Sequence, residues 1–218
     1  MPNADPSRNS DTGEPQPDLS AADTALTLQQ ELARKALHLL STAVPVAYSL
    51  GLARRGVTIG LTSALAIAAV VEVARARHQK TRTVFDARLG RLLRVHEAHG
   101  LSGATWLILA LLAAALLFPR DIAIAAMAAV AVGDAAAAIV GRAVTRHRGE
   151  GKSLAGSVAC LAASAFMAWA IADFTWPEAL VAGALAAIAE RPRRPLDDNL
   201  RIALAVGCGI LLWRMGFS

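Results

Sequence analysis

Residues 121–141 read DIAIAAMAAVAVGDAAAAIVG, an apolar run that contains the single central carboxylate Asp134. A helix needs about 20 mainly apolar residues to cross the hydrocarbon core of a bilayer. Similar runs occupy 37–53, 57–74, 101–118, 154–172, 178–189 and 202–217, although the run at 178–189 is short for a span. The pattern predicts an all-α, polytopic membrane protein with about seven transmembrane helices.

The composition agrees with this fold class. Hydrophobic residues make up 55% of the 218 residues and charged residues 18%, against about 25% charged in an average soluble domain. Cys160 and Cys208 lie inside apolar runs without a CxxC spacing, which predicts neither a disulfide framework nor a zinc site. Residues 1–25 are polar and acidic, so we expect a disordered tail before a single transmembrane domain at 26–218.

The basic residues are distributed unevenly along the chain. The N-terminal segment, the 75–100 and 142–153 loops and the 190–201 stretch together hold 18 of the 22 Lys and Arg residues. Because cytoplasmic loops retain positive charge, these segments are expected on the cytoplasmic side. This places the N-terminus inside and, with seven spans, the C-terminus outside. Basic residues placed between apolar runs favour membrane topology over nucleic-acid binding as the source of the net charge of +5.

Asp134 is the first candidate for chemistry, because a charge inside a membrane helix costs at least about 2.5 kcal/mol on insertion scales. Asp134, Ala137, Ala138 and Gly141 share one helical face, which leaves room for another helix or a ligand. Arg142 follows about 12 Å further toward the cytoplasm. The alternative is a structural ion pair inside the bundle.

The sequence GEGKSLAGS at 149–157 opens the fifth predicted helix and is like half of a phosphate-binding P-loop. The full pattern fails because Arg146 stands where the first glycine belongs. A helix N-terminus and a lysine can still bind an anion. The nucleotide-binding candidates are therefore Arg142, Gly151, Lys152, Ser153, Gly156 and Ser157. The alternative is that Lys152 only sets topology and Ser153 only caps the helix.

Acidic residues gather again where the sixth run ends and the seventh begins. Glu190 ends the sixth run, and Asp197, Asp198 and Asn199 precede the seventh. Their oxygens are ligands of the kind that Mg²⁺ uses together with phosphates, so the predicted metal ligands are Asp134, Asp197, Asp198 and Asn199. Capping of the last helix by Asp198 or Asn199 is the alternative.

Glu72 and His38 complete the candidate set. Glu72 precedes Arg75 by three residues, so a simple ion pair is one interpretation, and His38 could equally be an interfacial anchor near Arg34. In the predicted topology, all of these candidates lie at the cytoplasmic face. Carboxylates and cations gathered there predict a membrane-embedded phosphoryl-transfer site. The catalytic candidates are Asp134, Lys152, Glu190, Glu72 and His38.

In order and spacing, these motifs resemble the CTP-dependent lipid-alcohol kinase family, which includes dolichol kinase, phytol kinase and fungal-type diacylglycerol kinase. The resemblance, to a small bacterial-type member, covers about residues 31–217. It rests on Arg34-Lys35-Ala36-Leu37-His38 with Pro45, Glu72 with Arg75, Gly133-Asp134 through Gly141-Arg142, Gly151-Lys152-Ser153 with Gly156-Ser157, and Glu190 followed by Asp197-Asp198-Asn199.

This resemblance implies transfer of the γ-phosphoryl group of CTP to a polyprenol or dolichol, to phytol or to diacylglycerol, with Mg²⁺, at the cytoplasmic face. The expected partners are CTP, the lipid alcohol and the bilayer, without nucleic acid, and the oligomeric state is open. Nucleotidyl transfer of the phosphatidate cytidylyltransferase type is the alternative. A membrane transporter is a further alternative, although the sequence shows no inverted repeat of the kind that many transporters have.

The charge distribution generates a topology prediction. In a background without Cys160 and Cys208, a single cysteine at Arg88 should react with a membrane-impermeant thiol reagent only from the cytoplasmic side. A cysteine at Ser218 should react only from the opposite side. Labelling of Ser218→Cys from the cytoplasm would contradict seven spans.

Overall fold

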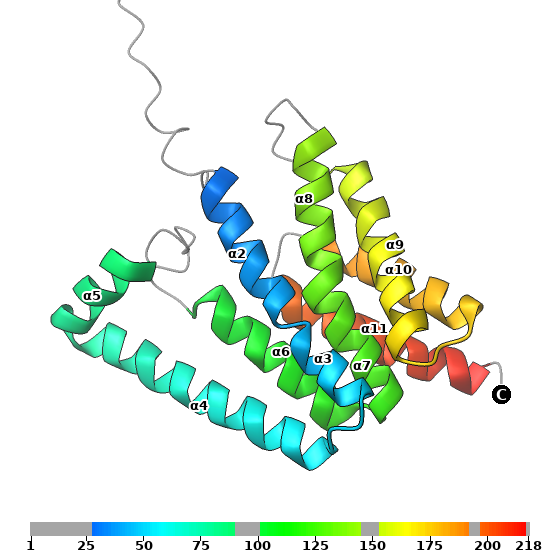
Figure 1. Ribbon diagram of the computed structural model, residues 1–218, viewed down its shortest axis with the longest axis horizontal. Coiled ribbons are helices and arrows are strands. Elements are labelled where there is room, and N and C mark those ends of the chain that lie inside the picture. The colour runs from blue at the N-terminus through cyan, green and yellow to red at the C-terminus, as the bar shows by residue number, and fades with distance from the viewer. Residues whose placement is uncertain (1–27, 90–100, 145–152, 192–196, 217–218) are drawn as a thin grey trace, which may run out of the picture.

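A computed structural model describes residues 28–89, 101–144, 153–191 and 197–216, which are helical almost throughout and contain no strand (Figure 1). The predicted all-α class is confirmed for this part of the chain, and the acidic tail lies outside it. The helices are α2 (Leu28–Leu40), α3 (Ala43–Ser49), α4 (Arg54–Arg77), α5 (Gln79–Leu89), α6 (Gly103–Leu117), α7 (Arg120–Ala128), the π-helical turn η3 (Ala129–Gly133), α8 (Asp134–Val144), α9 (Leu154–Ile171), α10 (Trp176–Glu190) and α11 (Asp198–Gly216).

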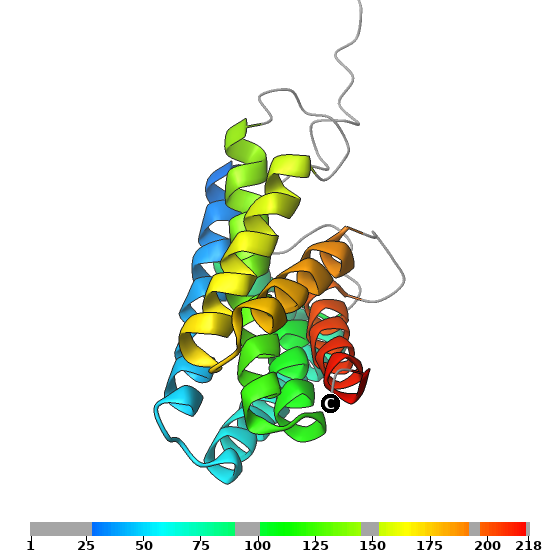
Figure 2. The ribbon, with the colours of Figure 1, turned by 90° about the vertical axis from the view of Figure 1, so that its right-hand side faces the viewer.

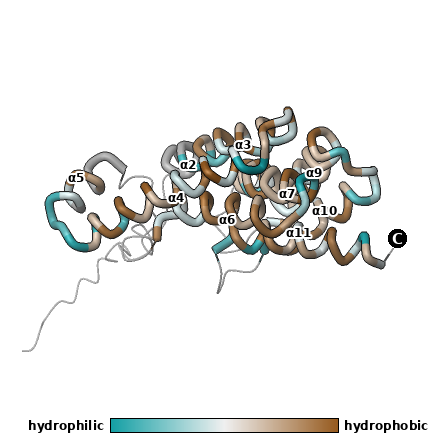
Figure 3. Tube along the Cα trace, turned by 90° about the horizontal axis from the view of Figure 1, so that it is seen from below, coloured by the Kyte–Doolittle hydropathy of each residue, from teal (hydrophilic) through white to brown (hydrophobic). Residues whose placement is uncertain are grey.

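Several of these helices have the length and composition of membrane spans. Within the described residues, four are long and apolar enough: α4, the continuous rod Arg120–Val144, α9 and α11. α6 is apolar but has 15 residues, and α10 is equally short. Hydrophobic residues cover much of the trace (Figure 3), and large ones such as Ile67 and Val70 on α4 are about two-thirds exposed. The chain thus has the character of a membrane protein, while the count of seven spans stays a prediction.

The first apolar run, expected as one helix over 37–53, is divided into α2 and α3. Pro45 has no N–H, and its ring would clash with the carbonyl of Ser41 in a regular helix. The helix tightens here: Ser41 donates its N–H to the His38 carbonyl at 3.0 Å, and Val44 donates to the Ser41 carbonyl at 3.0 Å. α2 and α3 therefore follow one another around a kink that lies just after His38.

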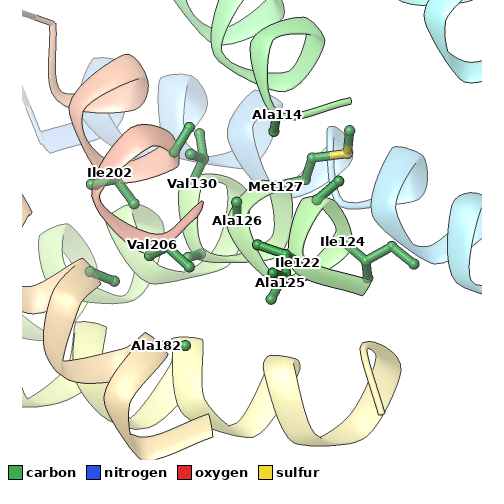
Figure 4. Packing of buried hydrophobic residues seen from close by; sticks show 14 of the residues in the cluster. Ala114, Ile122, Ile124, Ala125, Ala126, Met127, Val130, Ala182, Ile202 and Val206 are labelled. Atoms are coloured by element: carbon green, nitrogen blue, oxygen red, sulfur yellow. The ribbon is translucent and has the colours of Figure 1, made fainter. Parts of the chain in front are cut away.

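The rod formed by α7, η3 and α8 is the centre of the bundle. Of the 18 residues that form its most apolar stretch, 78% are buried, whereas the corresponding share in α4 is 11%. Figure 4 shows Met127 and Val130 of this rod close to Ala114 of α6 and to Ile202 and Val206 of α11. Helices α6, α9, α10 and α11 all pack against the rod. Asp134 consequently lies on the innermost helix of the described bundle and not on a lipid-facing one.

The π-helical turn comes immediately before Asp134. A π turn takes more residues per turn than the α-helix, so it changes the direction in which the following side chains point. Gly133 closes this turn, and a Cβ at Gly133 would collide with the Ser164 hydroxyl of α9. The glycine therefore lets α9 approach the rod next to the carboxylate.

The strip of small residues after Asp134 is the place where α8 and α9 meet. The sequence left open whether another helix or a ligand fills it, and the structure shows α9 there. A Cβ on Gly156 would lie 2.7 Å from the Ala137 carbonyl oxygen, and one on Gly141 would lie 2.9 Å from the Ser153 hydroxyl. Backbone approach between small residues is the usual way in which membrane helices pack.

This contact predicts the effect of one added methyl group. Gly156→Ala should destabilise the bundle by about 1–3 kcal/mol, because backbone atoms of α8 cannot move aside easily. The matched control is Gly60→Ala on α4, where a Cβ meets no atom within 4 Å. Thermal unfolding in detergent should show a lower Tm for Gly156→Ala only. Equal values for the two variants would mean that the two helices do not approach this closely.

Candidate functional site

The Asp134 carboxylate is buried in a group of basic side chains from α2. The Lys35 ammonium donates a hydrogen bond to Asp134 Oδ2, and His38 Nδ1 lies 3.5 Å from the same oxygen. The Arg34 side chain is also buried, and its charge acts on Asp134. α2 packs along η3 and α8, which brings these residues together from opposite parts of the chain. The site is therefore a carboxylate enclosed by cations inside a membrane helix bundle.

Lys35 is the residue that the sequence reasoning did not select for this site. Its side chain is 4% exposed and that of Asp134 is 11% exposed, so both charges are removed from water. The signal was present: an intramembrane carboxylate needs a cation, and Lys35 lies one helical turn before His38. The structural alternative given for Asp134, an ion pair inside the bundle, is therefore present as the pair Asp134–Lys35. Arg34 places a second permanent positive charge in the same buried group.

A second acid, Asp197, lies close enough to Asp134 for their charges to interact. Burial raises the pKa of Asp197, and the neighbouring carboxylates Asp198 and Asp134 raise it further. The hydrogen bond from the N–H of Asn199 lowers this pKa, but by less than the other effects raise it. That N–H donates to Asp197 Oδ1 at 2.9 Å, so Asp197 is the N-cap of α11. The sequence had offered Asp198 or Asn199 for capping, which the structure corrects.

The other predicted metal ligands differ in their surroundings. Asn199 is buried, and its Oδ1 has no hydrogen-bond partner among the described residues. Asp198 pairs with Arg201, which also donates to the carbonyl groups of Ala189 and Glu190 at the end of α10. Asp197 and Asn199 thus offer oxygens for a cation, whereas Asp198 helps to join α10 to α11.

In the described part of the chain, no group of three or more His, Cys, Asp and Glu residues could hold a metal ion by itself. Mg²⁺ is commonly bound by one or two carboxylates together with substrate phosphates, so a complete protein cage is not required. Asp134, Asp197 and the unpartnered Asn199 oxygen fit that donor set. A carboxylate has about four lone-pair positions, so Asp134 can accept from Lys35 and still offer an oxygen.

The start of α9 is organised largely by its own residues. Ser153 is the N-cap, and its hydroxyl accepts from the Gly156 N–H at 3.0 Å, as the capping alternative expected. Ser157 is buried and donates to the Ser153 carbonyl at 3.5 Å. Gly151 and Lys152 lie outside the described residues. The nucleotide-binding role of these residues stays a prediction.

The ends of these helices nevertheless share one side of the molecule. Figures 1 and 2 show the beginning of α2, the end of α8 and the beginning of α9 at the same end of the bundle. Arg142 lies exposed in the last turn of α8. Glu190, at the end of α10, is 5% exposed. These three helix ends thus lie together, while the gathering of all the candidate polar residues at one site stays a prediction.

Glu72 belongs to a different group of contacts. Its carboxylate pairs with Arg75 at 2.8 Å and accepts from the Ser102 N–H at 2.9 Å and from the Thr105 hydroxyl at 3.3 Å. The simple ion pair with Arg75 is therefore present. In addition, Glu72 ties the end of α4 to the beginning of α6, which gives this residue a structural role independent of catalysis.

Comparison with known proteins adds a relative of known activity. Over 153 residues, 68% of this chain, the sequence is 26% identical to the CTP-dependent diacylglycerol kinase 1 of Saccharomyces cerevisiae. The chain is a distant relative of this yeast kinase. It matches only 53% of the yeast protein's length. An uncharacterised protein of Rickettsia prowazekii is 26% identical over 140 residues, which is 63% of this chain and 68% of that protein. No family model and no solved structure matches.

The raised pKa of Asp197 predicts a pH-dependent effect on stability. The folded protein holds the proton of Asp197 more tightly than the unfolded chain does. Ionised Asp197 therefore destabilises the fold as the pH rises above about 3.9, the pKa of Asp in an unfolded chain. Asp197→Asn keeps an acceptor for the cap and removes this charge. It should raise the Tm at pH 7, and the gain should shrink toward about pH 4.

Asp198→Asn is the matched control, because it removes the neighbouring charge but also the pair with Arg201. This variant should not raise the Tm at pH 7. Thermal unfolding in detergent at several pH values measures both effects. A gain for Asp197→Asn that is the same at pH 4 and pH 7 would show that its charge is not the cause.

Proposed function

We propose that this protein transfers the γ-phosphoryl group of CTP to a membrane lipid alcohol at the cytoplasmic face, with Mg²⁺. The acceptor class comprises polyprenols, phytol and diacylglycerol. The observation that carries the proposal is the buried Asp134 carboxylate among Arg34, Lys35 and His38. The distant similarity to a CTP-dependent diacylglycerol kinase supports the same reaction class.

Phosphoryl transfer requires mainly positioning and neutralisation of negative charge, and little covalent chemistry from the protein. Mg²⁺, held by Asp134, Asp197 and Asn199, would neutralise charge on the phosphate oxygens. Arg34 and Lys35 add fixed positive charge in a place from which water is largely excluded, where electrostatic stabilisation is strongest. Lys152, Ser153 and Arg142 are proposed to hold the remaining phosphates.

The acceptor alcohol must be oriented and must lose a proton. Glu190 and Glu72 are the acids proposed for this role. The Glu72 carboxylate accepts from Ser102 and Thr105 and pairs with Arg75, and Glu190 is buried at the end of α10. His38 is buried beside Asp134 and is not an interfacial anchor, so it is proposed to assist proton movement there.

Product analysis with γ-labelled CTP and a panel of lipid alcohols and phosphatidate tests this function. A kinase transfers the label to the lipid and releases CDP. A cytidylyltransferase releases labelled pyrophosphate, and a transporter leaves CTP intact. Asp134→Asn should lower turnover by at least about a hundredfold, equal to about 2.7 kcal/mol in the barrier.

The control for Asp134→Asn is Asp121→Asn, at the other end of the same rod, which should keep most activity. Removal of Asp134 also leaves Lys35 buried without its carboxylate, which is destabilising. The double variant Asp134→Asn/Lys35→Met removes both charges and should recover stability but not turnover. Recovery of turnover as well would assign the ion pair a purely structural role.

A further inference from the structure

The end of α4 and the short helix α5 form a basic surface that the proposed reaction does not use. Between residues 75 and 89 the sequence has five Lys and Arg residues and one acid, Asp86. Arg77 and Lys80 are exposed. We propose that this surface, named the α5 surface and carried by Arg77 and Lys80, binds the headgroups of anionic lipids.

The position of α5 follows from the length of α4. The 24 residues of α4 extend about 36 Å, slightly more than the hydrocarbon core of about 30 Å. The helix ends at Arg77, His78 adopts an extended conformation, and α5 begins at Gln79. Because most of α4 is apolar and exposed, α5 begins where the hydrocarbon ends. Figure 1 shows α5 turning away from the end of α4, apart from the central helices.

A chain of contacts holds α5 in this position. The Arg75 guanidinium lies 5.0 Å from the centre of the Phe85 ring of α5 and pairs with Glu72 at 2.8 Å. Glu72 in turn accepts from the Ser102 N–H at the start of α6. Contacts that run from α6 through α4 thus orient α5, which keeps Lys80 near the end of α4 at the level of the headgroups.

The side chains favour charge attraction over insertion into the acyl chains. Hydrophilic residues colour the turn between α4 and α5 (Figure 3), and among the α5 side chains that the structure describes, Val84 is the large apolar one that is more than half exposed. A helix that inserts needs a continuous apolar face, whereas a basic segment beside a membrane helix attracts anionic lipids. The occupant that fits is therefore an anionic phospholipid headgroup.

Lipid quenching tests this proposal without any enzyme assay. The full chain, with Cys160→Ala, Cys208→Ala and Val84→Cys, carries a fluorophore at position 84 in nanodiscs of phosphatidylcholine and phosphatidylglycerol. Bromine is placed on one lipid or the other. The quenching caused by each brominated phosphatidylglycerol molecule should be about twice that caused by each brominated phosphatidylcholine molecule. This quenching ratio should fall to one at about 0.5 M NaCl, because salt screens the attraction.

Arg77→Gln with Lys80→Gln should bring this ratio to one without loss of the fold, because both side chains are exposed. The matched control is Arg55→Gln, which removes an exposed arginine at the other end of α4 and should leave the ratio unchanged. A ratio of one in the unsubstituted protein, or a ratio insensitive to the double substitution, overturns the proposal. A ratio that inorganic phosphate abolishes at constant ionic strength would assign the surface to soluble phosphates and also overturn it.

Discussion

The pairing of Asp134 with Lys35 is the interaction on which the arrangement of this bundle depends. A carboxylate on the innermost helix cannot be hydrated by bulk water, and lipid cannot solvate it. α2 must therefore lie along α8 at a depth that places Lys35 and His38 beside the carboxylate. Removing one partner of such a buried pair commonly costs about 3–5 kcal/mol. The polar site and the docking of the first helix are consequently one structural requirement.

Close backbone contacts make this arrangement rigid. In lipid, burial of apolar side chains gives little net attraction between helices, so packing must come from close approach. Gly156 meets the Ala137 carbonyl across the α8–α9 contact, and a Cβ on Gly183 of α10 would lie 2.5 Å from the Leu161 carbonyl of α9. Helices fixed at backbone distance hold the polar residues at their ends in defined positions. A preorganised group of charges is what electrostatic catalysis requires.

Much of the fold could be predicted because run length and composition are local properties. The helical class, most of the apolar segments and the presence of one carboxylate, Asp134, inside an apolar helix follow from them. The division at Pro45 is also local, because proline disturbs the helix in which it stands. The π turn before Asp134 and the choice of Lys35 as partner depend on contacts between distant segments. The same holds for Glu72, whose acceptor role involves Ser102, 30 residues away. Charge patterns indicated which residues are polar and buried, but not which of them meet.

Two carboxylates on the same rod show why Asp134 needs a functional explanation. Asp121 and Asp134 are 13 residues apart, about 20 Å along a helix. Asp121 lies in the first turn of α7, pairs with Arg214 at 2.6 Å, and has a side chain 36% exposed. Water and the helix dipole stabilise it, so its presence costs little. Asp134 has neither advantage, and a hydrophobic pair of similar size would often be as stable. The presence of this charge at a buried position therefore favours a role in chemistry over a role in stability.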